Sequence, residues 1–132
     1  MKKATAAKYS CVILDDDAMS VEILKQYISR IETMELTASF TEPVEAAAAF
    51  LDYEMVDFLF LDIQMEVSGL DIARMFRDKA RFIVFVTGYK EFALEAFENG
   101  DAYLVKPVDF KTLLRAIKHV TARSAKQSAL RL

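Results

Sequence analysis

The stretch Phe58-Leu59-Phe60-Leu61-Asp62 joins four consecutive apolar residues to an aspartate. A short apolar run of this kind is typical of a strand that is buried on both faces, as in a parallel sheet covered by helices. Two further apolar runs are also followed by charged residues. Residues 11–14 precede three aspartates, and residues 103–105 precede Lys106. If these runs are parallel strands, their charged residues lie at one edge of one sheet.

Segments with helical spacing alternate with short apolar runs along the chain. We predict strands at residues 12–14, 36–40, 58–61, 82–86 and 102–105. We predict helices at residues 21–31, 44–51, 72–76, 92–97 and 110–120, where apolar residues recur every three or four positions. This strict alternation predicts an α/β fold, a doubly wound five-stranded parallel sheet with helices on both faces and right-handed crossovers.

The order of the strands follows from where the polar residues fall. In open α/β sheets, ligands bind beyond the carboxyl ends of the strands, where the strand order reverses. Polar residues suited to a site follow the first, third, fourth and fifth strands, whereas the second is followed only by Thr41-Glu42-Pro43. We therefore predict the order 2-1-3-4-5, as in flavodoxin-like folds.

Length and composition describe one globular domain. The 132 residues are 54% hydrophobic and 28% charged, which is ample for a buried core. We assign residues 1–8 to an N-terminal tail, 9–122 to the domain, and 123–132 to a C-terminal tail or the start of a linker. The single cysteine, Cys11, excludes an internal disulfide, and its apolar surroundings indicate a buried, inert thiol.

Charge and hydropathy limit the partners and the cellular compartment that the sequence predicts. The net charge of −3 gives no electrostatic reason to bind nucleic acid. No apolar stretch reaches the ~18 residues of a membrane span, and the start of the chain lacks the apolar core of a signal peptide. We expect a cytoplasmic protein that binds neither a membrane nor nucleic acid directly. His119 lies off the apolar stripe of the last helix, so we expect a solvated surface residue.

The polar residues at the predicted sheet edge suit phosphoryl transfer onto an aspartate. Asp15, Asp16 and Asp62 would repel one another unless a cation lies among them. Magnesium prefers hard oxygen ligands and neutralises charge on a transferring phosphoryl group. Lys106 would pair with that group as a point charge. The hydroxyl of Thr87 would donate a hydrogen bond to another phosphoryl oxygen.

Four motifs resemble those of the receiver domain of bacterial two-component response regulators. They are Leu14-Asp15-Asp16-Asp17, Phe60-Leu61-Asp62-Ile63-Gln64-Met65, Val86-Thr87-Gly88-Tyr89 and Tyr103-Leu104-Val105-Lys106-Pro107. The resemblance covers residues 9–122. The second motif, together with the eleven residues that start at Thr87, is most similar to receivers of LytTR-type transcription regulators.

The resemblance implies a role for each site residue. Asp62 is the phosphoacceptor, and a sensor histidine kinase is the donor. Asp16 binds Mg²⁺ directly, Asp15 acts through water, and Asp62 with the backbone carbonyl of Gln64 completes the protein ligands. Lys106 pairs with the phosphoryl group. The implied function is a two-component phosphoprotein that regulates transcription and is not an enzyme, apart from its own Mg²⁺-dependent phosphorylation and dephosphorylation.

The resemblance also implies a switch. Thr87 moves toward the phosphate and Tyr103 swings inward behind it, so that the face formed by the last two helices and the last strand changes. We expect a homodimer contact on that face after phosphorylation. The bond between Lys106 and Pro107 is commonly cis in this family, and a cis bond costs little before proline.

The chain departs from the family pattern in two loops. Glu66 stands where the family usually has proline, and Gly69 comes seven rather than eight positions after the acceptor. The stretch Asn99-Gly100-Asp101-Ala102 is also one residue short before the last strand. The first departure bears on the loop over the phosphate and the second on the switch face, whereas every chemical group named above is retained.

Two other functions fit part of the pattern. A phosphatase of the haloacid-dehalogenase class also uses strand-end aspartates, and Asp15-x-Asp17 superficially fits its nucleophile motif, but only Asp109 offers an acid beyond the lysine. The second alternative is a receiver-like interaction module that no longer takes phosphate, and the short acceptor loop motivates it.

Overall fold

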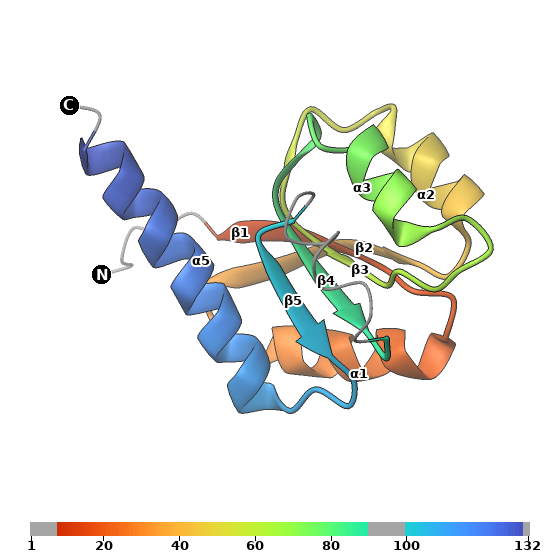
Figure 1. The fold of residues 1–132 in the computed structure, drawn as a ribbon, viewed down its shortest axis with the longest axis horizontal. Coiled ribbons are helices and arrows are strands. Elements are labelled where there is room, and N and C mark those ends of the chain that lie inside the picture. The colour runs from red at the N-terminus through yellow and green to blue at the C-terminus, as the bar shows by residue number, and fades with distance from the viewer. Residues whose placement is uncertain (1–7, 90–99, 131–132) are drawn as a thin grey trace, which may run out of the picture.

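The sheet and its helices follow the predicted arrangement. A computed structural model describes residues 8–89 and 100–130 of the chain. The five strands form one sheet in the order β2-β1-β3-β4-β5, and every neighbouring pair is parallel (Figure 1). The predicted fold class and strand order are therefore confirmed. The elements in chain order are β1 (Tyr9–Leu14), α1 (Ala18–Ser29), β2 (Met34–Phe40), α2 (Pro43–Phe50), β3 (Val56–Leu61), α3 (Gly69–Met75), β4 (Ala80–Thr87), β5 (Ala102–Val105) and α5 (Phe110–Leu130).

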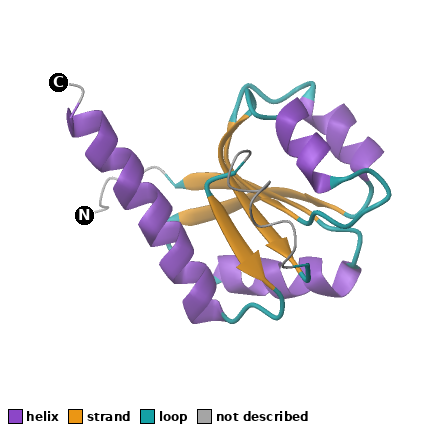
Figure 2. Cartoon of the chain, in the orientation of Figure 1, coloured by secondary structure: helices purple, strands orange, loops and turns teal. Residues whose placement is uncertain are grey.

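Helices cover both faces of the sheet. Helices α2 and α3 lie on one face, and α1 and α5 lie on the other (Figure 2). Along β3, Leu59 and Leu61 join the core under α2 and α3, while Phe58 and Phe60 join the core under α1 and α5. Successive side chains of a strand point to opposite faces. Because both faces are buried here, all four residues are apolar.

Local signals mark the starts of two helices. The carboxylate of Asp17 accepts a hydrogen bond from the Met19 amide at 3.0 Å and caps α1. The hydrogen bonds from Ser20 and Met19 hold the pKa of Asp17 below its ordinary value. Pro43 is the first residue of α2, where its missing N–H has no partner to lose.

Several elements are longer than the apolar patterns predict. Strands β2, β3 and β4 each begin two residues before the predicted start. The predicted final stripe ends at Val120 and the predicted tail begins at residue 123, but α5 continues to Leu130. Its last turns contain good helix formers and no glycine or proline, so the helix continues without an apolar face. The helix predicted at residues 92–97 lies outside the described residues.

Cys11 and His119 lie in the environments that the sequence predicts. Cys11 is fully buried, and burial raises the pKa of its thiol to about 12, so the thiol stays protonated. His119 is exposed on α5. In the described part of the chain, every helix is too short or too polar to cross a membrane.

Candidate functional site

The register between β1 and β3 brings two aspartates together. Leu14 lies beside Leu61 in the parallel ladder, and the amide of Asp62 donates to the carbonyl of Leu14 at 3.1 Å. Asp15 and Asp62 therefore leave neighbouring strands at the same level. Both residues are buried, so little water is present to screen the repulsion between their carboxylates.

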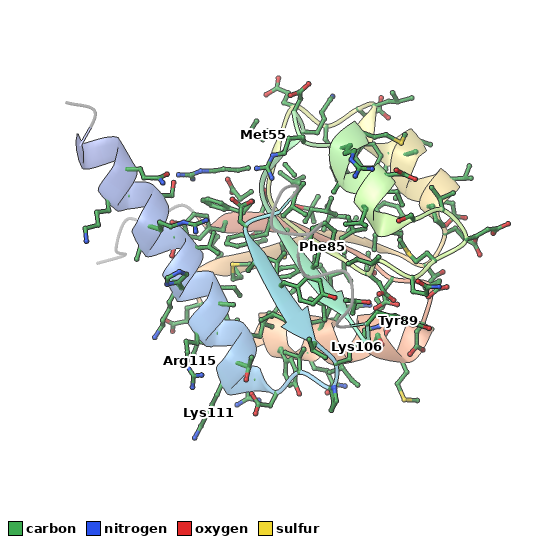
Figure 3. The ribbon with its side chains drawn as sticks, in the orientation of Figure 1. Met55, Phe85, Tyr89, Lys106, Lys111 and Arg115 are labelled. Carbon is green, nitrogen blue, oxygen red and sulfur yellow. The ribbon has the colours of Figure 1, made fainter. Side chains whose placement is uncertain are left out.

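Lys106 supplies the compensating charge. Its amide donates to the carbonyl of Thr87 at 2.8 Å, which fixes the lysine at the carboxyl edge of the sheet (Figure 3). From there its Nζ reaches across β4 and donates to Asp15 Oδ2 at 2.7 Å and to Asp62 Oδ2 at 3.3 Å. The side chains of residues 15, 62 and 106, far apart in the sequence, thus form one cluster.

Burial and pairing set the charges in this cluster. Burial raises the pKa of Asp15, and hydrogen bonds from Lys106 and from the Asp17 amide oppose part of that rise. Burial alone would lower the pKa of Lys106, but the hydrogen bond to Asp15 and the charges of both carboxylates raise it overall. Lys106 therefore keeps its proton, as a group that pairs with an incoming anion must.

Asp16 completes a set of oxygen donors. Asp15, Asp16 and Asp62 each offer a carboxylate oxygen, and these oxygens lie within 4.8 Å of one another. Three carboxylate oxygens this close together can serve one cation as a group. Since all the donors are hard oxygens, the set fits Mg²⁺.

The other residues predicted for the site lie around the cluster. Gln64 is exposed, and its backbone amide donates a hydrogen bond to Asp62 Oδ1 at 3.3 Å. Thr87 is fully buried at the end of β4, and its hydroxyl accepts from the Tyr89 amide at 3.4 Å. Tyr103 lies on β5, three residues before Lys106, with its ring centroid 6.5 Å from that of Phe85 and its hydroxyl buried. The Lys106–Pro107 bond is cis.

The short acceptor loop closes tightly against the backbone of Asp62. The amides of Met65 and Gly69 both donate to the carbonyl of Ile63, at 3.1 and 2.8 Å. A Cβ atom at position 69 would lie 2.0 Å from the backbone oxygen of Asp62 and 2.7 Å from the Cα of Ile63. Only glycine fits here. In the sequence Gly69 stood out as a shifted family position, and its contact with the acceptor backbone is visible only in three dimensions.

Asp101 is a structural residue that the sequence analysis did not single out. It lies in the second shortened loop, at the sheet edge opposite the cluster. Its carboxylate accepts from the Ile83 amide at 2.8 Å and pairs with Arg77 at 3.3 Å and Arg123 at 3.9 Å. Asp101 thus ties β4 to the residues after α3 and to the far part of α5. The one signal for it in the sequence is an aspartate directly after a loop glycine.

An apolar groove opens beside the cluster. It has a volume of about 380 Å³ and lies between α1 and the connection from β5 to α5. Ile23 of α1 lines it and is 43% exposed, and Met19 nearby on α1 is 69% exposed. The full lining is Ser20, Ile23, Leu24, Tyr27, Val86, Lys106, Pro107 and Val108.

The match to a known family shows what kind of domain this chain forms. The profile of the response regulator receiver domain matches residues 11–118. The chain belongs to this family. The receiver is 36% identical over 114 residues to an uncharacterized response regulatory protein of Shewanella oneidensis, covering 84% of the chain and 48% of that protein. It is 33% identical over 119 residues to the transcriptional regulatory protein BtsR of Escherichia coli, covering 88% and 49%. The chain spans about half the length of the curated relatives it matches.

Solved receiver structures share the fold of the chain. The response regulatory domain of mrkE from Klebsiella pneumoniae has a TM-score of 0.77 and 29% identity, covering 89% of this chain and 98% of that one. The response regulator TrrA from Thermotoga maritima, solved in complex with Mg²⁺-BeF, has a TM-score of 0.72 and 28% identity, covering 85% and 98%. Receiver domains are regulatory phosphoacceptor domains that bind Mg²⁺ at an acidic pocket, and Asp15, Asp16 and Asp62 of this receiver form a cluster of carboxylates.

Proposed function

We propose that this receiver is a signalling switch that accepts a phosphoryl group on Asp62 from a histidine kinase, with Mg²⁺, and controls transcription. The observation that carries the proposal is the buried carboxylate of Asp62, with Lys106 Nζ at 3.3 Å and the oxygens of Asp15 and Asp16 within 4.8 Å. A carboxylate so placed has both a cation partner for the incoming phosphate and ligands for a metal beside it.

In the proposed reaction, a carboxylate oxygen of Asp62 attacks the phosphorus of a phosphohistidine. The new O–P bond forms as the N–P bond of the donor breaks, and the leaving imidazole takes up a proton. Lys106 already lies beside the attacking carboxylate. A small movement of its Nζ therefore lets the ammonium group exchange its ion pairs with Asp15 and Asp62 for one with a phosphoryl oxygen. Thr87 donates its hydroxyl hydrogen bond to another phosphoryl oxygen.

The proposed metal ligands are Asp16, Asp62 and the backbone carbonyl of Gln64, with Asp15 acting through water. Both carboxylate oxygens of Asp15 already accept hydrogen bonds, Oδ2 from Lys106 at 2.7 Å and Oδ1 from the backbone amide of Asp17 at 2.9 Å, and this is compatible with an indirect role for Asp15. When bound, Mg²⁺ supplies positive charge that neutralises the phosphoryl oxygens.

The proposed output is a change on the face made by β5 and α5; the helix predicted at residues 92–97, which the resemblance adds to this face, lies outside the described residues. Thr87 lies at the end of β4 and Tyr103 lies on the neighbouring strand β5, where Phe85 pairs with Tyr103. A shift of the Thr87 hydroxyl toward a phosphate on Asp62 opens space along this pair of strands, and Tyr103 moves inward behind it. We place the proposed homodimer contact on this face.

A donor kinase must also contact the surface around Asp62. The apolar groove beside Lys106 and the exposed side chains of Met19 and Ile23 give that surface an apolar region on α1. We propose that they bind the donor protein. Ile23→Glu is then expected to slow transfer from a histidine kinase that phosphorylates the unmodified chain, and to leave phosphorylation by acetyl phosphate unchanged. Equal rates from the kinase with both chains would contradict this assignment.

Acetyl phosphate with Mg²⁺, followed by intact mass measurement, tests the function. We expect one phosphoryl group per chain, none on Asp62→Asn, and one on the control Asp78→Asn, whose side chain is exposed after α3. Modification that persists in Asp62→Asn overturns the acceptor. Continuous turnover of p-nitrophenyl phosphate would favour the phosphatase alternative. Unchanged NMR spectra after addition of beryllofluoride and Mg²⁺ would favour the interaction module.

A further inference from the structure

The small net charge conceals a strong separation of charge along the chain. Residues 110–132 contain six lysines and arginines and no aspartate or glutamate. The preceding 109 residues contain eleven basic and twenty acidic residues. Residues 110–132 therefore carry a charge of +6 and residues 1–109 a charge of −9, so the argument from net charge does not apply to α5.

The apolar side of α5 is already in use. Leu113, Ile117 and Val120 are buried in the core against the sheet and α1. Through Gln127, the exposed side of the helix carries no large exposed apolar side chain. From Phe110 to Gln127, the helix therefore has no apolar face left to insert into a membrane or to anchor a hydrophobic protein interface.

The exposed side of α5 carries a basic stripe. Lys111, Arg115 and Lys118 follow one another at helical spacing, and Lys126 continues the stripe two turns later. All four are exposed. Figure 3 shows Lys111 and Arg115 pointing away from the body of the protein. At a rise of 1.5 Å per residue, the stripe extends over about 22 Å.

One exposed carboxylate, Asp109 directly before α5, interacts with Arg115 and Lys111, and it offsets only part of the charge of the stripe. Within residues 8–89 and 100–130, no carboxylate lies within 4.0 Å of Lys111, Arg115, Lys118 or Lys126. Arg123, on another side of α5, is the helix residue that has an ion pair, with Asp101. By contrast, most exposed arginines elsewhere, such as Arg74, are paired.

We propose that the basic stripe of α5 contacts the phosphate backbone of duplex DNA. A polyanion with closely spaced charges matches a stripe whose charged residues are all cationic and which has no apolar anchor. Phosphates recur about every 3.4 Å along one strand, so the stripe spans several of them. The choice of DNA rests on the transcriptional part of the proposed function, because a regulator works beside DNA. The contact is independent of base sequence and supplements any sequence-specific one.

The test uses fluorescence anisotropy of a labelled 25-base-pair duplex with the full chain at low salt. We expect the chain to bind the duplex. A plot of the logarithm of the association constant against the logarithm of the salt concentration should have a slope of about −3 to −4, as four phosphate contacts require. The variant Lys111→Gln/Arg115→Gln/Lys118→Gln is expected to bind at least about ten-fold more weakly, with a slope shallower by about 2.7. The control Lys8→Gln/Lys25→Gln/Arg74→Gln removes the same net charge elsewhere and is expected to bind within about three-fold of the unmodified chain.

Several results would overturn the proposal. One is no binding by the unmodified chain at 20 mM salt, and another is an equal loss in both triple variants. A third is self-association in sedimentation that the α5 variant abolishes without any DNA binding, because the stripe would then face the acidic surface of a second copy. The α5 variant keeps the whole aspartate cluster, so its phosphorylation by acetyl phosphate reports on the proposed switch separately from DNA binding.

Discussion

Replacement of Gly69 by alanine is the sharpest test of how the acceptor loop is built. The new Cβ would lie 2.0 Å from the backbone oxygen of Asp62, whereas real Cβ contacts are essentially never shorter than 3.0 Å. The start of α3 or the acceptor backbone must therefore shift by about 1 Å. The obstructing atoms belong to the backbone, so no side chain rotation relieves the clash. Overpacking of this kind costs about 1–3 kcal/mol, and we expect the upper part of that range.

Urea unfolding measures this cost, and Gly88→Ala is the matched control. Among the described residues, and apart from its two chain neighbours, no atom lies within 4 Å of a Cβ added at position 88. We therefore expect the free energy of unfolding of Gly88→Ala to stay within about 0.5 kcal/mol of that of the unmodified protein. Gly69→Ala should also slow phosphorylation by acetyl phosphate, because the shift moves Asp62 relative to Lys106. If the two alanine variants unfold at the same urea concentration, the close packing of α3 on the acceptor backbone is wrong.

Three further changes probe other parts of the protein. Lys106→Met leaves the carboxylates of the cluster without their cation, so it should lower the free energy of unfolding by about 1–3 kcal/mol without Mg²⁺. Added Mg²⁺ should restore part of that loss. If the free energy of unfolding of the variant is the same with and without Mg²⁺, the metal does not bind at the carboxylates that Lys106 contacts. The Cys11 thiol, with its pKa raised to about 12, should not react with Ellman's reagent at pH 8 until the protein is unfolded, and rapid reaction of the folded protein would place it nearer the surface. Asp101→Ala removes the acceptor of the Ile83 amide and two ion pairs, so it should lower the free energy of unfolding in urea by about 1–2 kcal/mol. The exposed control Asp78→Ala should change it by no more than about 0.5 kcal/mol. Equal urea midpoints for the two variants would show that the contacts of Asp101 do not stabilise the fold.

The sheet and the position of the site were predictable from the sequence for a simple physical reason. A strand buried on both faces admits only apolar residues, so the runs that end at Leu14 and Leu61 stand out from their surroundings. In a parallel sheet their carboxyl ends share one edge. The register that sets Leu14 beside Leu61 then brings Asp15 and Asp62 together. The carboxylate cluster follows from local patterns and one topological rule.

Features that depend on exact distances were not predictable. Lys106 lies closer to Asp15 than to Asp62, at 2.7 against 3.3 Å, which depends on how a flexible side chain crosses β4. The need for glycine at position 69 depends on how closely α3 approaches the acceptor backbone. The length of α5 was underestimated because an exposed helix needs only residues of good helix propensity, and these leave no apolar period to detect.

The position of the phosphoryl group tests the central claim most directly. The chain is phosphorylated with acetyl phosphate and Mg²⁺, the acyl phosphate is reduced with borohydride, and the resulting homoserine is located by peptide sequencing. We expect homoserine at position 62 alone, with Asp15 and Asp16 unchanged. Homoserine at position 15 or 16, or its absence from a chain that has gained a phosphoryl group, would contradict the account.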